Sequence, residues 1–211
     1  MLDLIVKRVK VGIISTNCYI LKDRNSRDAI VIDPGGDLTV IQDAIHKLDA
    51  CCRAILLTHG HFDHILAVGD LRRSDIPVCI HKDDAHFLTE RDAFSSVIPY
   101  DPRPFEPADM LFDKEGSYSV AGFDFYVIHT PGHTMGSVCY MFGGMLFTGD
   151  TLFKGSAGTT DFGGSEEAIQ KSLRMLYDLP GDYEIYPGHD EFSTLQDERE
   201  NNPYMKVFAR K

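Results

Sequence analysis

The chain has 211 residues, of which 43% are hydrophobic, so it is long enough to bury one sizeable core. Its formal net charge of −11 argues against nucleic acid and anionic membranes as partners, because both require clustered lysine and arginine. The start lacks a basic region followed by a long apolar one, and no stretch reaches membrane-spanning length. We therefore expect a cytoplasmic protein with no nucleic-acid partner and no membrane partner.

The first half of the chain begins with strand-like segments. Residues 4–10, 18–22 and 29–32 are three apolar segments separated by glycine and polar residues, which predicts an antiparallel meander. Apolar residues then recur at helical spacing over residues 38–48, with Asp37 as the expected N-cap. This helix is expected to cover one face of the sheet.

The middle of the chain alternates strands and helices before it becomes rich in proline. The run 54–57 predicts a buried strand, followed by a helix beginning near Ile65, a strand over 76–80 and a short helix over 83–88. Four prolines and three aromatic residues make regular structure improbable between residues 91 and 109. That loop is either a lid over a binding site or a plain surface connection.

The second half of the chain, like the first, is predicted to consist of strands with a helix. Strands are expected over 117–120, 123–129, 137–142, 145–148 and 184–186, with one helix over 166–177. Two strand-rich halves with helices outside predict an α/β fold, specifically a four-layer αβ/βα sandwich. We expect residues 1–211 to form a single domain. The five cysteines are odd in number and lack a CxxC spacing, so reduced, buried thiols are expected.

One short segment concentrates metal-binding side chains. His59, His61, Asp63 and His64 fall within six residues, directly after the strand predicted over 54–57. A strand cannot direct all four side chains to one point, because neighbouring side chains point to opposite faces, so the segment must curl. Neutral imidazole together with carboxylate is the usual ligand set for zinc or iron. The alternative is a set of solvated loop histidines, which is plausible for one histidine but not for the cluster.

Three further candidates follow later strands. His133, Asp150 and His189 each come after an apolar, strand-like run and lie beside a glycine. The carboxyl ends of strands are where α/β folds place their sites. Five histidines and two carboxylates are enough for two metal ions rather than one.

The motifs His-x-His-x-Asp-His, Pro-Gly-His-Thr, Thr-Gly-Asp and Pro-Gly-His, in this order, resemble those of the metallo-β-lactamase superfamily. The resemblance extends from the Ile32-Asp33-Pro34-Gly35-Gly36 segment to His189, and it is closest to the glyoxalase II-like hydrolases. It implies the metallo-β-lactamase fold. It also implies that His59, His61 and His133 bind a first metal ion, that Asp63, His64 and His189 bind a second, and that Asp150 bridges them.

The expected cofactors are two divalent metal ions, with zinc favoured and iron or manganese as alternatives. Two such ions can lower the pKa of a bridging water toward 7, so the expected nucleophile is a metal-bridging hydroxide. Asp63 would bind one metal and orient or deprotonate this water, which makes it the candidate catalytic residue. A thiol with a pKa near 8.5 leaves without a strong general acid. A small-molecule thioester is therefore the favoured substrate, and hydrolysis the favoured reaction.

The resemblance points to a short, stand-alone branch of these enzymes, hydroxyacylglutathione hydrolase-like in its chemistry. Glyoxalase II proper carries an added C-terminal helical domain that helps to hold glutathione, whereas here only residues 190–211 follow His189. We expect that domain to be absent. Relatives carry arginine or lysine where this chain has Thr159, which leaves the thiol carrier open.

The same motifs are compatible with functions other than thioester hydrolysis. A persulfide dioxygenase, which uses one iron and only part of the ligand set, resembles this chain around residues 158–162. A lactonase or a phosphodiesterase comes next. A metal-containing binding domain without turnover is a different class, which the complete ligand set disfavours. The acyl group, the physiological metal and the oligomeric state do not follow from the sequence.

Overall fold

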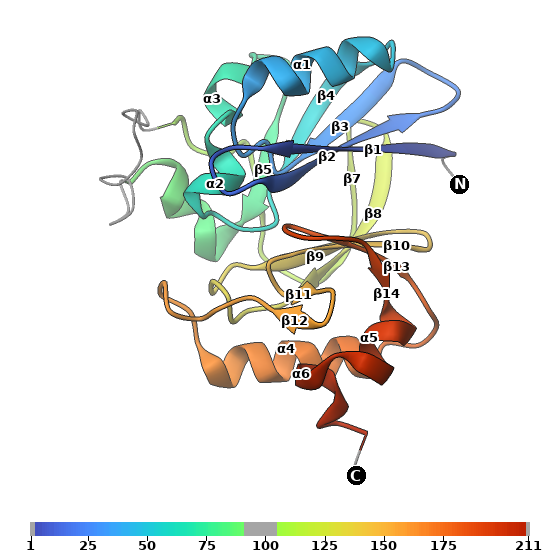
Figure 1. Ribbon diagram of the computed structural model, residues 1–211. Coiled ribbons are helices and arrows are strands. Elements are labelled where there is room, and N and C mark those ends of the chain that lie inside the picture. The colour runs from blue at the N-terminus through green and yellow to red at the C-terminus, as the bar shows by residue number, and fades with distance from the viewer. Residues whose placement is uncertain (1–2, 91–104, 210–211) are drawn as a thin grey trace. The chain divides into compact units, whose positions relative to one another are not determined.

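The computed structural model describes residues 3–90 and 105–209, which form two compact units (Figure 1). The first unit comprises Met1–Asp113 with Val120–Phe123, and the second comprises Lys114–Ser119 with Asp124–Lys211. Each unit has its own sheet and its own helices. The expectation of a single domain over residues 1–211 stays a prediction.

The first sheet has six strands in the order β1-β2-β3-β4-β5-β6. Their bounds are β1 Leu4–Val11, β2 Thr16–Asp23, β3 Asp28–Ile32, β4 Cys51–Leu56, β5 Val78–His81 and β6 Met110–Phe112. Strands β1, β2 and β3 pair antiparallel, which confirms the predicted meander, and β3 to β6 pair parallel. The sheet is therefore mixed, and the carboxyl ends of β3, β4 and β5 share one edge.

The helices of the first unit pack on one face of this sheet. They are α1 Leu38–Lys47, α2 Phe62–Ile65, α3 Val68–Leu71 and the 3₁₀ helix η1 Lys82–Leu88. Ile41 and Ala44 of α1 join a buried cluster with Ile20, Val31 and Ile55 of the strands. The apolar spacing that predicted α1 is thus its buried face.

Two local predictions in this unit need correction. Asp37 is the N-cap residue of α1, as predicted, but its side chain makes no capping hydrogen bond; its Oδ2 accepts a hydrogen bond from Gly12 N at 2.9 Å instead. Its left-handed backbone, with φ of 45°, accompanies this tertiary contact. The helix expected near Ile65 begins at Phe62 instead, because His61 adopts the extended conformation of an N-cap. Asp63 and His64 therefore lie on a helical turn rather than on a loop.

The second sheet also has six strands, in the order β14-β13-β10-β9-β8-β7. Their bounds are β7 Gly116–Val120, β8 Phe123–His129, β9 Val138–Phe142, β10 Met145–Gly149, β13 Glu184–Pro187 and β14 Ser193–Thr194. Strand β10 pairs antiparallel with β9 and parallel with β13. Because β8 is also antiparallel to β9, the strands β8, β10 and β13 all end at the same edge.

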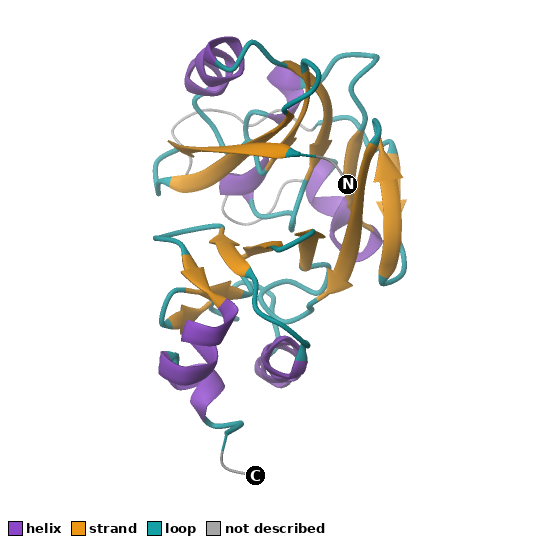
Figure 2. Ribbon diagram, turned by 90° about the vertical axis from the view of Figure 1, so that its right-hand side faces the viewer, coloured by secondary structure: helices purple, strands orange, loops and turns teal. Residues whose placement is uncertain are grey.

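Three helices lie on one face of this sheet (Figure 2). They are α4 Glu166–Asp178, α5 Leu195–Asn201 and α6 Pro203–Lys206, and a small hairpin is formed by β11 Leu152–Phe153 and β12 Ser156–Ala157. Leu173 of α4, Leu195 of α5 and Met205 of α6 are fully buried with strand residues Leu146 and Ile185. The predicted helix over 166–177 is confirmed, whereas the hairpin, β14, α5 and α6 were not predicted.

Central strands such as β3 and β9 bury side chains on both faces, so their apolar runs are nearly continuous. Among residues 3–90 and 105–209, no helix is long and apolar enough to cross a membrane. The cytoplasmic location stays a prediction.

Most of the proline-rich segment predicted as a lid or a surface connection, residues 91–104, lies outside the described residues. Residues 105–109 are irregular, as expected, and lead into β6.

Candidate metal centre

The first unit brings four predicted metal ligands together just beyond the end of β4. His59 and His61 lie on the connecting loop, and Asp63 and His64 follow on α2. All four are buried, with exposed fractions between 0% and 8%. The His59 ring centroid lies 4.8 Å from that of His61 and 4.1 Å from that of His64. The curl expected from the spacing of these residues is thus present.

Asp33, at the end of β3, organises this group. Its carboxylate accepts hydrogen bonds from Thr58 N at 2.8 Å and from Thr58 Oγ1 at 2.7 Å, and its Oδ2 lies 2.9 Å from His64 Nδ1. A carboxylate only accepts, so His64 Nδ1 carries the hydrogen and Nε2 carries the lone pair. Asp33 is 1% exposed and has a φ of 52°, a left-handed conformation that aspartate tolerates better than most residues.

The hydrogen bond between Asp33 and Thr58 also sets the tautomer of His59. The single hydroxyl hydrogen of Thr58 goes to Asp33, and Thr58 Oγ1 lies 3.1 Å from His59 Nδ1. His59 Nδ1 must therefore donate to Thr58, which leaves the lone pair of His59 on Nε2. A histidine whose other nitrogen donates to an oxygen is the usual form of a metal-binding imidazole. The buried Asp33 carboxylate thus sets the tautomers of two of the four candidate ligands, His59 and His64.

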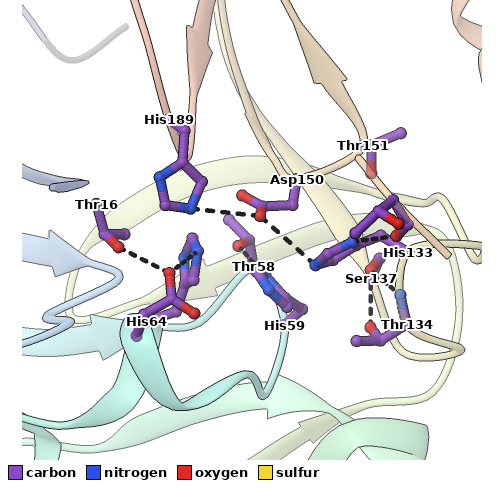
Figure 3. Close-up of polar contacts among 12 residues, drawn as sticks. Thr16, Thr58, His59, His64, His133, Thr134, Ser137, Asp150, Thr151 and His189 are labelled. Atoms are coloured by element: carbon purple, nitrogen blue, oxygen red, sulfur yellow. Dashed lines mark hydrogen bonds and ion pairs between the residues drawn. The ribbon is translucent and has the colours of Figure 1, made fainter. Parts of the chain in front are cut away.

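Asp63 is oriented by a neighbour from β2. Thr16 Oγ1 donates to Asp63 Oδ2 at 2.7 Å, and the same oxygen lies 3.2 Å from His64 Nε2 (Figure 3). Since Nε2 presents its lone pair, this approach of two electron-rich atoms requires either an added proton or a cation. The donor chemistry therefore fits a metal ion.

Close backbone packing shapes the loop around these donors. Gly60 N donates to Asp84 Oδ2 of η1 at 2.9 Å, and a Cβ at Gly60 would lie 2.4 Å from the Phe87 ring. A Cβ at Gly35 would lie 1.6 Å from the carbonyl oxygen of Asp63. Only glycine fits at either position, so both glycines fix the path of the ligand segment.

The second unit brings the other three predicted ligands together at one edge of its sheet. His133 follows β8, Asp150 follows β10 and His189 follows β13. The parallel register pairs Gly149 with Pro187, and Gly188 N donates to Gly149 O at 2.8 Å, which explains why Asp150 and His189 are neighbours. Figure 3 shows the imidazoles of His133 and His189 directed at the Asp150 carboxylate.

A backbone carbonyl sets the tautomer in this group. The Thr159 carbonyl oxygen lies 2.7 Å from His133 Nδ1, and a carbonyl only accepts, so Nε2 of His133 carries the lone pair. Asp150 Oδ2 lies 3.5 Å from Nε2 of His133 and 3.5 Å from Nε2 of His189. One carboxylate oxygen facing two imidazole nitrogens is again a donor set suited to a cation.

Three supporting residues were not among the predicted site residues: Thr16, Asp84 and Asp33. Asp33 had a signal, because it is a polar residue directly after an apolar strand, within the segment that opens the family resemblance. Thr16 and Asp84 belong to distant parts of the sequence and had no local signal. In the second unit the missed contribution is the Thr159 carbonyl, because residue type does not reveal a backbone contact.

Comparison with known proteins identifies the family. A family model described as the metallo-beta-lactamase superfamily matches residues 11–189. A Bacillus velezensis protein described as a probable polyketide biosynthesis zinc-dependent hydrolase, BaeB, is 34% identical over 178 residues, covering 83% of this chain and 73% of its own.

Two solved structures have the same fold. The crystal structure of BLEG-1 B3 metallo-beta-lactamase is 35% identical, covers 95% of this chain and 99% of its own, and has a TM-score of 0.88. The crystal structure of TTHA1623 in a di-iron-bound form is 32% identical, covers 94% of this chain and 99% of its own, and has a TM-score of 0.80. The predicted fold class is confirmed as α/β with two mixed sheets. The chain belongs to the metallo-β-lactamase superfamily.

Proposed function

We propose that this protein is a metal-dependent hydrolase of small thioesters, similar in its chemistry to glyoxalase II. The proposal rests on the hydrogen bonds that fix which nitrogen of each candidate histidine ligand carries the lone pair. Hydrogen bonds to Asp33, Thr58 and Thr159 place the lone pairs of His64, His59 and His133 on Nε2, and carboxylates of Asp63 and Asp150 lie beside imidazoles. Such preparation is what metal binding requires.

The ligand roles that we propose are those that the family resemblance implies. His59, His61 and His133 would hold one ion, Asp63, His64 and His189 would hold the other, and Asp150 would bridge them. BaeB is described as zinc-dependent and TTHA1623 contains two irons, which supports zinc or iron as the metals here. Manganese is the remaining candidate, because carboxylate ligands also suit it.

Two bound cations would lower the pKa of a water held between them toward 7, supplying the nucleophile, and would polarise the substrate carbonyl. Asp63 would orient that water, since its Oδ2 is itself fixed by the Thr16 hydroxyl. A thiolate leaves as the anion at neutral pH, so the reaction needs no strong acid from the protein. This match between site and leaving group favours a thioester over an amide or a phosphodiester.

The partner we propose is a small thioester rather than a macromolecule. The formal net charge of −11 disfavours nucleic acid, which needs clustered cations. Glutathione is one candidate thiol carrier and a polyketide-type carrier thiol is another; BaeB is described as acting in polyketide biosynthesis.

The decisive experiment combines metal analysis with turnover. Protein purified without added metal should contain close to two metal ions, and the zinc-loaded form should hydrolyse members of a thioester panel without oxygen. Asp150→Ala should disturb both ions and abolish most activity. Asp178→Ala, on the exposed end of α4, is the control and should change neither.

Other outcomes would replace the proposal. Iron-dependent oxygen uptake with a persulfide, without thioester turnover, would assign a dioxygenase instead. Rapid opening of a chromogenic β-lactam would place the protein with BLEG-1, and a lactone or phosphodiester preferred over every thioester would change the substrate class. Full metal content without turnover of any substrate would favour a binding domain. Full metal and full activity in Asp150→Ala would refute the bridging role.

A further inference from the structure

The hairpin formed by β11 and β12, together with the two residues that follow it, lies against all three donor residues of the second unit. Thr151 is the only residue between Asp150 and the hairpin, and the Phe153 ring packs edge-on against His189 with centroids 5.9 Å apart. Just beyond it, a Cβ at Gly158 would lie 1.8 Å from the carbonyl oxygen of Asp150 and 3.0 Å from Nδ1 of His133. The next residue, Thr159, provides the carbonyl that accepts from His133. The position of this hairpin therefore affects His133, Asp150 and His189 together.

The hairpin is too short to hold itself in place. Each strand has two residues, and the register pairs Leu152 with Ala157 and Phe153 with Ser156. An isolated two-stranded ribbon of this length is not stable in water. Its position must come from contacts with other elements.

Two buried side chains from α5 and the start of α6 make those contacts. Asn202 Nδ2 donates to the carbonyl oxygens of Phe153 at 3.2 Å and Ser156 at 2.9 Å, and Glu198 Oε2 accepts from Gly155 N at 2.8 Å. Glu198 and Asn202 are 1% and 0% exposed. Three backbone groups of the hairpin, on both strands and on the turn, are thus held by two side chains.

These two side chains also hold each other. Asn202 Nδ2 also lies 2.8 Å from Glu198 Oε2, so its two hydrogens are shared among three acceptors, and Ser193 Oγ donates to Glu198 Oε1 in a short hydrogen bond. Asn202 Oδ1 accepts from Tyr204 N and so caps α6. A buried carboxylate that accepts three hydrogen bonds is costly to disturb, which makes the network rigid.

We infer that Glu198 and Asn202 are positioning residues for the metal centre, acting through the hairpin on His133, Asp150 and His189. The inference deepens the proposed function and rests on it. Partners of metal ligands typically change metal affinity by about 10- to 100-fold when they are removed. Here the effect is expected from residues that touch no proposed ligand.

The test compares two pairs of neighbours on full-length protein. Glu198→Gln and Asn202→Asp change the network, while Glu200→Gln and Asn201→Asp make the same chemical changes at exposed positions of α5. Zn²⁺ and Co²⁺ affinities are measured by titration, together with the Co²⁺ absorption spectrum and the thermal unfolding midpoint. We expect the network variants to bind at least one ion about 10- to 100-fold more weakly, with an altered Co²⁺ spectrum, and the controls to match the wild type.

A lower unfolding midpoint with unchanged affinity and an unchanged Co²⁺ spectrum would overturn the inference, because it would show a merely structural role. If Glu198→Gln does not fold, Ser193→Ala removes one of the three hydrogen bonds to the Glu198 carboxylate and should weaken binding by less than about tenfold; an unchanged affinity there would refute the inference. A wild-type protein that binds no metal would overturn the proposed function and the inference together. Two ions bound equally well by wild type and network variants would overturn the inference alone.

Discussion

The two groups of donors are held by different parts of the chain. In the first unit, His59 to His64 form one segment held by side chains, with Asp33 and Thr16 as the partners of the donors. In the second unit, the donors come from three strand ends, and His133 is held by the Thr159 backbone carbonyl. Side-chain support is lost by a single substitution, whereas a backbone carbonyl survives most substitutions. The two halves should therefore respond differently to mutation.

The largest effect is expected for Asp33→Asn. Asparagine fits the left-handed backbone, but its amide cannot accept all the hydrogen bonds that fix Thr58, His59 and His64. Metal affinity should fall about 10- to 100-fold, measured by titration of metal-free protein. The control is Asp49→Asn, an exposed position with a similar φ of 49°, which should leave affinity unchanged. Equal affinities in the two variants would show that Asp33 does not prepare the histidines.

A smaller effect, limited to substrate binding, is expected for Thr159→Arg. The contact to His133 uses the carbonyl of residue 159, so metal content should be retained, while the new cation can pair with a glutathione carboxylate. The KM for S-lactoylglutathione should fall several-fold, up to about a hundredfold for a partly desolvated contact, at nearly constant kcat. The neighbour Thr160→Arg is the control. Loss of metal in Thr159→Arg would mean that the side chain, which donates to Asp161, supports the loop after all.

Arg199→Ala is expected to lower the stability of the fold without changing metal binding. Arg199 donates to the carbonyl oxygens of Tyr177, Leu179 and Gly181, and so satisfies the carboxyl end of α4. Its removal should lower the free energy of unfolding by about 1.5–3 kcal/mol, measured by urea denaturation. Lys171→Ala, which removes an exposed ion pair on the same helix, should lower the free energy of unfolding much less, because solvent screens such a pair. Weakened metal binding in Arg199→Ala would show that the network around Glu198 extends further than proposed.

The smallest difference between the units is expected in the rate at which their buried thiols are alkylated. Burial raises the pKa of Cys79 in the first sheet and of Cys139 in the second, each to about 12. An unfolded thiol titrates near 8.5, so the unfolded chain loses these protons first, and stability is lost as the pH rises from about 8.5 toward 12. At pH 8, mass spectrometry should show equally slow alkylation of both. Faster labelling of one would identify the unit that opens more readily.

The sequence predicted the long, apolar elements and the donors for clear physical reasons. Strands such as β3 and β4 are buried on both faces, so their composition alone identifies them. The seven donor residues were evident because imidazole and carboxylate rarely cluster after strands without a chemical reason. Their assignment to two ions came from the family resemblance, and it stays a prediction.

Other features depend on tertiary contacts or on helix capping rather than on apolar periodicity. The Asp37 carboxylate is taken by Gly12 rather than by its own helix, which no local pattern reveals. By contrast, α5 had a local signal: Thr194 caps it by accepting from Asp197 N, within a Thr-Leu-Gln-Asp sequence typical of a helix start. The following Asn202-Pro203 similarly begins α6. These short polar helices were not predicted because they lack the apolar periodicity of longer helices such as α4.

The parallel pairing of β10 with β13 also has a consequence for folding. Asp150 and His189 become neighbours only after the chain has completed α4 and returned to lie beside β10. Parallel pairings over such separations form slowly, because loop closure costs entropy before any contact is gained. The donors from His59 to His64, in contrast, belong to one turn of chain. Metal arriving during synthesis would therefore meet the first group as a nascent, partial ligand set, and the donors of the second group would be assembled only once β10 and β13 have paired.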